Sequence, residues 1–260
     1  MRADHGPVCA LRDAQFRRLF TGQALSSFGD SALYLTLGIW AKTLTGSNAA
    51  AGGVFLALAA PTLLAPLAGH LADRMRRKTL LIAVNAITAL IVASLIFVRS
   101  RDQLWLIYLV AFCYGTSFDL LSAAGSGLRK DMLRDEDLAS ANALLQLASQ
   151  GLRVLSPLVG SGLFVVFGGP SVAIFDAVTF LAAITATASL RVAEYEPDQA
   201  HEPFWRATAA GFRHIRSVPL LAQLTLVSAM AFSVIGSARR SSMRSSARAC
   251  TGLPRLSEWC

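Results

Sequence analysis

The chain has 260 residues, of which 54% are hydrophobic and only 15% charged, and its mean hydropathy is +0.50. These values lie outside the range of an ordinary soluble domain and leave too little polar chain to cover an apolar core. The formal net charge is +8, and its distribution between loops indicates membrane topology, so it gives no reason to expect nucleic-acid binding.

Seven apolar segments follow one another, and each is long enough to cross a bilayer, whose core needs about 20 apolar residues. They cover residues 19–44, 49–71, 79–98, 104–128, 138–167, 171–190 and 219–238. The first is too long for the apolar region of a signal peptide, so we expect it to be retained. The sequence therefore predicts an all-α polytopic membrane protein.

The segments divide the chain into four parts. Residues 1–190 are expected to form a six-helix N-terminal transmembrane bundle, and residues 191–218 a cytoplasmic central loop that holds either an interfacial helix or a solvated linker. Residues 219–238 are the seventh helix. Residues 239–260 form an Arg/Ser-rich disordered tail, which indicates a frame-shifted or truncated reading frame or, alternatively, a translocated tail.

Positive residues alternate between the loops. Fifteen lie at the N-terminus and in the second, fourth and sixth loops, whereas three, Lys42, Arg99 and Arg101, lie in the other loops. Because cytoplasmic loops carry an excess of Lys and Arg, this pattern predicts a cytoplasmic N-terminus.

Polar residues form stripes on three of the predicted helices. Their spacings of three, four, seven, eight and eleven residues place them on one face of each helix. The stripes are Gln23, Ser27, Asp30 and Tyr34; Asp119, Ser122, Ser126 and Arg129; and Asn142, Gln146, Gln150 and Arg153. A water-filled path bounded by these three helices would satisfy all of them.

Ionisable residues at membrane depth cost at least about 2.5 kcal/mol each, so they are functional candidates. Asp30, Asp119 and Arg153 are the main ones, with the alternative that one aspartate pairs with Arg153 only to fix helix packing. For Asp176 we expect helix capping or a packing hydrogen bond. Asn85 and Thr88 suggest hydrogen bonds between helices.

Proline and glycine residues predict bends and close helix contacts in two segments. Pro61 and Pro66 lie in the second segment, and Pro157, Gly160 and Gly162 lie in the fifth. Such bends would let one bundle rock, but a purely structural kink fits the sequence equally well.

Catalytic and cofactor chemistry have no support in the sequence. The four cysteines have no metal-ligand or disulfide spacing, and no phosphate-binding Gly-rich motif is present. We therefore expect no enzyme activity, no metal and no cofactor, and a seven-helix receptor or intramembrane enzyme lacks the constellation that it would need.

The loop between the second and third segments resembles the cytoplasmic signature of the major facilitator superfamily. The matching residues are Gly69, Asp73, Arg74, Arg77 and Lys78, with Arg76 in place of a second glycine. Residues 26–30, 45–47, 137–143, 150–160 and 176–180 resemble the branch that includes enterobactin exporters and macrolide efflux proteins. The resemblance covers about residues 12–236.

The resemblance implies twelve helices in two bundles, with a small-molecule substrate bound between them and export driven by proton entry. Asp30 and Arg153 would form the cavity or coupling site with Gln146, Gln150, Asp119 and Tyr34, and Asp73 with Arg74 would form a conformational latch. Partners would be the lipid bilayer of a bacterial inner membrane, protons, a drug, macrolide or siderophore, and a missing C-terminal half. The alternative is a truncated, non-transporting remnant.

Overall fold

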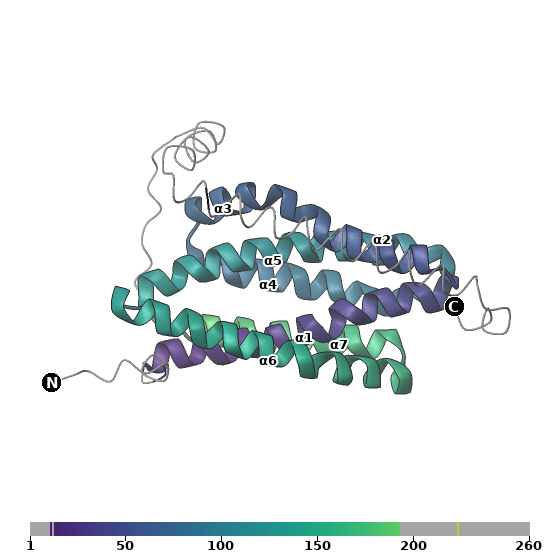
Figure 1. Ribbon diagram of the computed structural model, residues 1–260. Coiled ribbons are helices and arrows are strands. Elements are labelled where there is room, and N and C mark those ends of the chain that lie inside the picture. The colour runs from purple at the N-terminus through teal and green to yellow at the C-terminus, as the bar shows by residue number, and fades with distance from the viewer. Residues whose placement is uncertain (1–10, 12, 193–222, 224–260) are drawn as a thin grey trace. The chain divides into compact units, whose positions relative to one another are not determined.

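The computed structural model describes residues 11, 13–192 and 223. Within these residues all regular structure is helical, and the helices form six rods that lie side by side (Figure 1). The predicted central loop beyond residue 192, the seventh helix apart from residue 223, and the tail 239–260 lie outside the described residues.

The first rod is helix α1, Ala14–Thr45. The Asp13 side chain caps its start by accepting a hydrogen bond of 2.7 Å from the backbone N–H of Gln15. The helix ends at Gly46, whose φ of 71° lies in the left-handed region that favours glycine. Both ends are therefore set by local sequence.

The second rod is broken where the sequence predicts bends. It consists of α2, Asn48–Ala59, the 3₁₀ helix η2, Ala60–Leu64, and α3, Ala65–Arg74. Pro61 and Pro66 lie near the starts of η2 and α3, since proline lacks the N–H that would continue the preceding α-helix. The predicted bend in this segment is confirmed.

The third and fourth rods are neighbours. The third is α4, Arg77–Ala93, which continues into the 3₁₀ helix η3, Ser94–Phe97. The fourth begins with the short 3₁₀ helix η4, Arg101–Gln103, and continues as α5, Leu104–Met132. Each is longer than the apolar segment that predicts it, because polar residues near the membrane surface extend the helix.

The fifth and sixth rods are α6, Asp135–Phe167, and α7, Gly169–Ala188. Three acidic residues in the first turn of α6 favour its start by opposing the positive end of the helix dipole. Pro157 lies inside α6 without dividing it. Gly168, with a φ of 82°, separates the two helices.

Helix α1 holds the bundle together by packing against α2, α5, α6 and α7, while α4 packs between α5 and α7. At the contact between α1 and α6, a Cβ atom on Gly160 would lie 2.6 Å from the carbonyl oxygen of Ala32. The predicted close approach is therefore confirmed at Gly160. A Cβ atom on Gly162 would meet nothing within 4 Å, so the same prediction is wrong there.

Five rods in the described part of the chain are long and apolar enough to cross a membrane: Asn48–Arg74, Arg77–Phe97, Arg101–Met132, Asp135–Phe167 and Gly169–Ala188. Helix α1, with 32 residues, is as long as these but less apolar, because it carries the stripe that includes Asp30. The predicted all-α polytopic membrane fold is confirmed.

Candidate functional site

A polar cavity of about 320 Å³ lies between α1, α4, α5, α6 and α7. Its volume is at the lower end of the range for small-molecule sites, about 300–1,000 Å³. Hydroxyl, amide and charged side chains contribute much of its lining: Gln23, Ser26, Ser27, Asp30, Asn85, Ser122, Arg129, Asn142, Gln146, Ser149 and Thr187. The three helices that carry the predicted stripes all line this cavity, together with α4 and α7.

Each stripe lines the cavity only in part. Gln23, Ser27 and Asp30 line it from α1, but Tyr34 lies farther along. The ring of Tyr34 instead packs on Phe55 of α2, with a centroid distance of 5.5 Å. The prediction that Tyr34 lines this cavity is therefore wrong.

Helix α6 contributes Asn142 and Gln146 to the lining, whereas Gln150 and Arg153 lie beyond it and are exposed. In the described part of the chain no carboxylate forms an ion pair with Arg153. The hypothesis that Asp30 or Asp119 pairs with Arg153 is therefore wrong, and the Arg153 side chain is exposed.

Arg129 is the cation that lines the cavity. Its Nε atom donates to Oδ1 of Asn142 at 2.9 Å, and its Nη1 atom donates to Oε1 of Gln23 at 3.5 Å. These bonds connect α5 to α6 and α1. Because both acceptors are neutral amides, the charge of Arg129 is solvated by dipoles and is not cancelled by a described carboxylate.

Asp30 on α1 accepts a hydrogen bond from a residue of α5. The hydroxyl of Tyr114 donates a hydrogen bond of 2.5 Å to Oδ1 of Asp30. Tyr114 is buried, and its ring packs edge-on against Phe180 of α7 with the centroids 6.2 Å apart. This arrangement holds the cavity-lining carboxyl group in place from two neighbouring helices.

Asp176 lies behind this pair, on α7. It is fully buried, close to the Tyr114 hydroxyl and to Asp30. Its Oδ1 atom accepts a hydrogen bond of 3.4 Å from Thr179, and its Oδ2 atom has no hydrogen-bond partner among the residues that the structure describes. Since α7 begins at Gly169, Asp176 is two turns inside the helix, and the capping prediction is wrong.

Gly29 makes room for Asp176 at the contact between α1 and α7. A Cβ atom at this position would collide with Oγ1 of Thr179 and Oδ1 of Asp176. The absence of a side chain therefore lets α7 bring a carboxyl group next to the residue that follows Gly29, which is Asp30.

Two other predictions for polar residues need correction. Asp119 is half-buried and does not line the cavity, and its Oδ2 atom has no partner among the described residues. Asn85 and Thr88 donate to the carbonyl oxygens of Leu81 and Val84, both at 2.7 Å. These bonds lie within α4, so they do not connect helices as expected.

The signature residues form a second group, at the junction of α3, α4 and α5. Only Met75 and Arg76 lie between α3 and α4, so the loop is much shorter than the predicted span of residues 69–78. Arg76 has a φ of −59°, which explains why a side chain is accepted where the signature has glycine. Gly69, Asp73 and Arg74 belong to α3.

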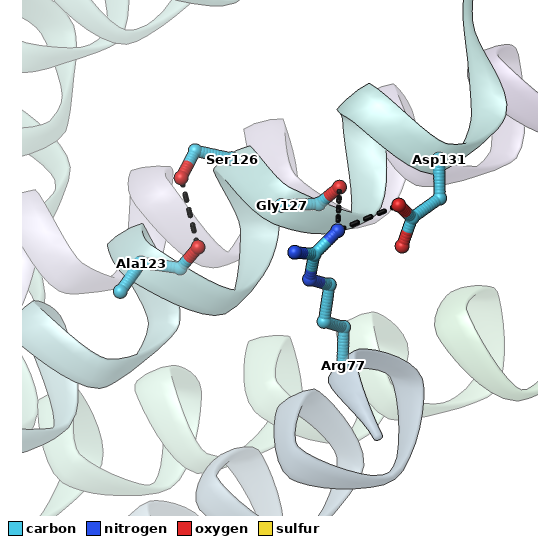
Figure 2. A network of polar contacts seen from close by, with 5 residues as sticks. All are labelled: Arg77, Ala123, Ser126, Gly127 and Asp131. Atoms are coloured by element: carbon cyan, nitrogen blue, oxygen red, sulfur yellow. Dashed lines mark hydrogen bonds and ion pairs between the residues drawn. The ribbon is translucent and has the colours of Figure 1, made fainter. Parts of the chain in front are cut away.

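Arg77 joins the start of α4 to the end of α5 (Figure 2). Its Nη1 atom lies 2.6 Å from Oδ1 of Asp131 and 3.0 Å from the carbonyl oxygen of Gly127. Lys78 donates to the carbonyl oxygen of Leu190, after α7, at 2.7 Å. Among the signature cations, Arg77 thus pairs with an acid on a neighbouring helix, while Asp73 is exposed.

Tyr114 is the main site residue that the sequence analysis missed. It lies eight positions before Ser122, which places it on the same face of α5 as the predicted stripe. Extending the stripe by two turns would have found it, but only the contact between α1 and α5 identifies its partner.

Comparisons with known proteins agree with this architecture. The family model of the Major Facilitator Superfamily matches residues 19–243. An uncharacterized MFS-type transporter of Bacillus subtilis (strain 168), YfiS, is 27% identical over 164 residues, which are 62% of this chain and 39% of that protein. The chain thus spans about two fifths of the length of this curated relative. No solved structure matches.

Proposed function

Because the chain belongs to the Major Facilitator Superfamily, we propose that it is a secondary active transporter that exports small molecules in exchange for protons. The family consists of transporters, so a catalytic constellation is not needed. The substrate would be of the drug, macrolide or siderophore type that the resemblance to enterobactin exporters and macrolide efflux proteins implies.

Asp30 is the observation that carries the proposal. It lines a polar cavity inside a bundle of apolar helices, and a tyrosine hydroxyl fixes its position. Placing a carboxyl group at membrane depth costs free energy, so such a group is a functional candidate. Because Asp30 lines the cavity, gaining or losing a proton changes the charge of the cavity wall. Such a group can couple proton entry to substrate release.

The rest of the lining suits a loosely selective site. Gln23, Asn142 and Gln146 offer both donors and acceptors, and Arg129 supplies a cation whose described hydrogen-bond acceptors are uncharged amides. A substrate oxygen or anionic group could replace one of those amide contacts. Broad recognition by a few polar groups on an otherwise apolar wall is typical of small-molecule cavities.

The proposed transporter includes a second helix bundle that faces this cavity. This bundle belongs either to a longer form of the same chain or to a separate chain. It also places the N-terminus and the turn at Met75 and Arg76 in the cytoplasm of a bacterial cell, at the inner membrane, as the distribution of Lys and Arg favours. There Arg77 and its partner Asp131 would form part of a latch that breaks when the transporter changes shape.

The test is proton-coupled efflux from reconstituted vesicles. The chain is inserted into liposomes together with a C-terminal six-helix bundle of a relative, a pH gradient is imposed, and export of a macrolide, a catechol siderophore and a cationic dye is followed. We expect export to require the gradient and to be lost in Asp30→Asn. Asp102→Asn is the matched control, because Asp102 is exposed in η4, outside the cavity. Export that is independent of Asp30 contradicts the coupling assignment.

A non-transporting remnant is the second candidate. In a remnant, the exposed Gln150 and Arg153 on α6 would stay uncovered because no second bundle would pack on them. This candidate predicts that the chain inserts into the membrane but exports none of the three compounds, and that coexpression with a C-terminal six-helix bundle of a relative restores no export.

A further inference from the structure

We propose that Asp176 is a second proton-binding site, which is filled from the cavity through Asp30 and the Tyr114 hydroxyl. The proposal extends the proposed function by adding a residue on α7 to the coupling site. It rests on the arrangement of three side chains from three helices: Asp30 on α1, Tyr114 on α5 and Asp176 on α7.

Burial isolates Asp176 from every source of protons except its neighbours. The residue is 0% exposed and does not line the cavity, whereas Asp30 does. Tyr114 is also absent from the lining, and it hydrogen-bonds Asp30 while lying close to Asp176. The tyrosine is therefore the described side chain that connects the outer carboxyl group to the inner one.

No cation compensates a charge on Asp176. In the described chain neither Asp30 nor Asp176 forms an ion pair with Arg, Lys or His, and the cavity cation, Arg129, is held by Gln23 and Asn142. From α4, the polar side chains Asn85 and Thr88 are uncharged and bonded within their own helix. Two charged carboxylates in this surrounding would repel each other strongly.

A proton on Asp176 relieves the repulsion between the two carboxylates and gives the Oδ2 atom a hydrogen to donate. It removes the charge and turns the Oδ2 atom, which has no partner among the described residues, into a donor. Tyr114 packs on Phe180, one turn from Asp176 on α7, and its oxygen can accept because its own hydrogen is directed at Asp30. Transfer then needs no other reactant. Before transfer the Tyr114 hydroxyl turns its hydrogen toward Asp176. The O–H bond on Asp30 then breaks as one forms on Tyr114, and the original O–H bond of Tyr114 breaks as one forms on Asp176, which leaves the new Tyr114 hydrogen directed at Asp30 as in the structure.

Infrared spectroscopy of the purified full chain in lipid tests the proposal without requiring transport. A protonated carboxyl group has a C=O band that is distinct from that of a carboxylate. At neutral pH we expect one such band that is lost in Asp176→Asn and kept in Asp119→Asn. Asp119 is the matched control, since it also has an unpartnered oxygen but lies outside the cavity lining. Labelling aspartate with ¹³C must shift the band, which assigns it without any substitution.

The route is tested by the rate at which this band shifts after transfer to D₂O. Tyr114→Phe keeps the ring on Phe180 but removes the hydroxyl, so we expect the shift to slow by at least about tenfold, which corresponds to about 1.4 kcal/mol in the barrier. If the unmodified chain shows the Asp176 band but exports none of the compounds, the proposed function is contradicted and the inference about Asp176 is not. A spectrum unaffected by Asp176→Asn or by aspartate labelling, or an unchanged exchange rate in Tyr114→Phe, would overturn this inference.

Discussion

The Tyr114 hydroxyl on α5 lies 2.5 Å from Oδ1 of Asp30 on α1 and donates a hydrogen bond to it. The two residues are 84 positions apart in the chain, so neither helix alone shows the pair. The bond fixes the carboxyl group that faces the cavity and connects it to α7, where Asp176 lies close to the same hydroxyl. Three helices therefore meet at one polar point inside the bundle.

Removing this hydroxyl is expected to destabilise the protein. Tyr114→Phe preserves the edge-on contact with Phe180 and leaves Oδ1 of Asp30 without its donor. We expect a loss of about 1–2 kcal/mol in the free energy of unfolding, measured by denaturation in detergent. Tyr108→Phe is the control: its hydroxyl donates to the carbonyl oxygen of Ala50 at 3.2 Å, and a smaller loss is expected.

A methyl group at position 29 is expected to separate α1 from α7. In Gly29→Ala the new Cβ atom would collide with Thr179 and Asp176, so the protein should lose about 1–3 kcal/mol through overpacking. Gly69→Ala is the matched control, because a Cβ atom there meets nothing within 4 Å. In α3 this change should instead stabilise by about 0.5–1 kcal/mol. Equal thermal stabilities of the two variants would contradict the described packing.

The contact between Arg77 and Asp131 is expected to couple α4 to α5. Their side chains are only 24% and 17% exposed, and a double-mutant cycle of Arg77→Gln and Asp131→Asn should give a coupling of about 1 kcal/mol. The pair Arg134 and Glu136 is a control with exposures of 82% and 56%, for which we expect a coupling near zero. Similar couplings in both cycles would argue against a special role for Arg77.

Cysteine labelling checks the cavity. In a background without the native cysteines, Ser122→Cys should react with a water-soluble maleimide, since Ser122 is exposed and lines the cavity. Ser117→Cys, on the same helix, should react far more slowly because Ser117 is only 7% exposed. The ratio of the two labelling rates is the measurement, and a ratio near one would mean that water does not reach this cavity preferentially.

The chain without its native cysteines also serves to test the proposed orientation in the membrane. Arg76→Cys and Arg101→Cys place single thiols at exposed positions near opposite ends of the helices. If the N-terminus is cytoplasmic, a membrane-impermeant maleimide added to intact cells should label position 101 and should label position 76 only after lysis. The reversed pattern would overturn the orientation.

Sequence alone determined which segments are helices and where the second rod bends. Spans of apolar residues require helices in lipid because each backbone polar group must be satisfied within its own segment, and Pro61 and Pro66 act through their own missing N–H groups. These are local effects, and helix periodicity also placed Gln23, Ser27 and Asp30 on one face.

Only the tertiary structure decided which faces meet. The sequence leaves open a pair between Arg153 and either Asp30 or Asp119, whereas in the structure Tyr114 contacts Asp30 and Arg153 is exposed. The choice depends on the rotation of each helix about its axis, which is set by packing such as that of Gly29 against α7 and Gly160 against α1. Close contacts of this kind join distant segments, so they are absent from any single helical pattern, and they bring Asp176 next to Gly29 and close to Asp30.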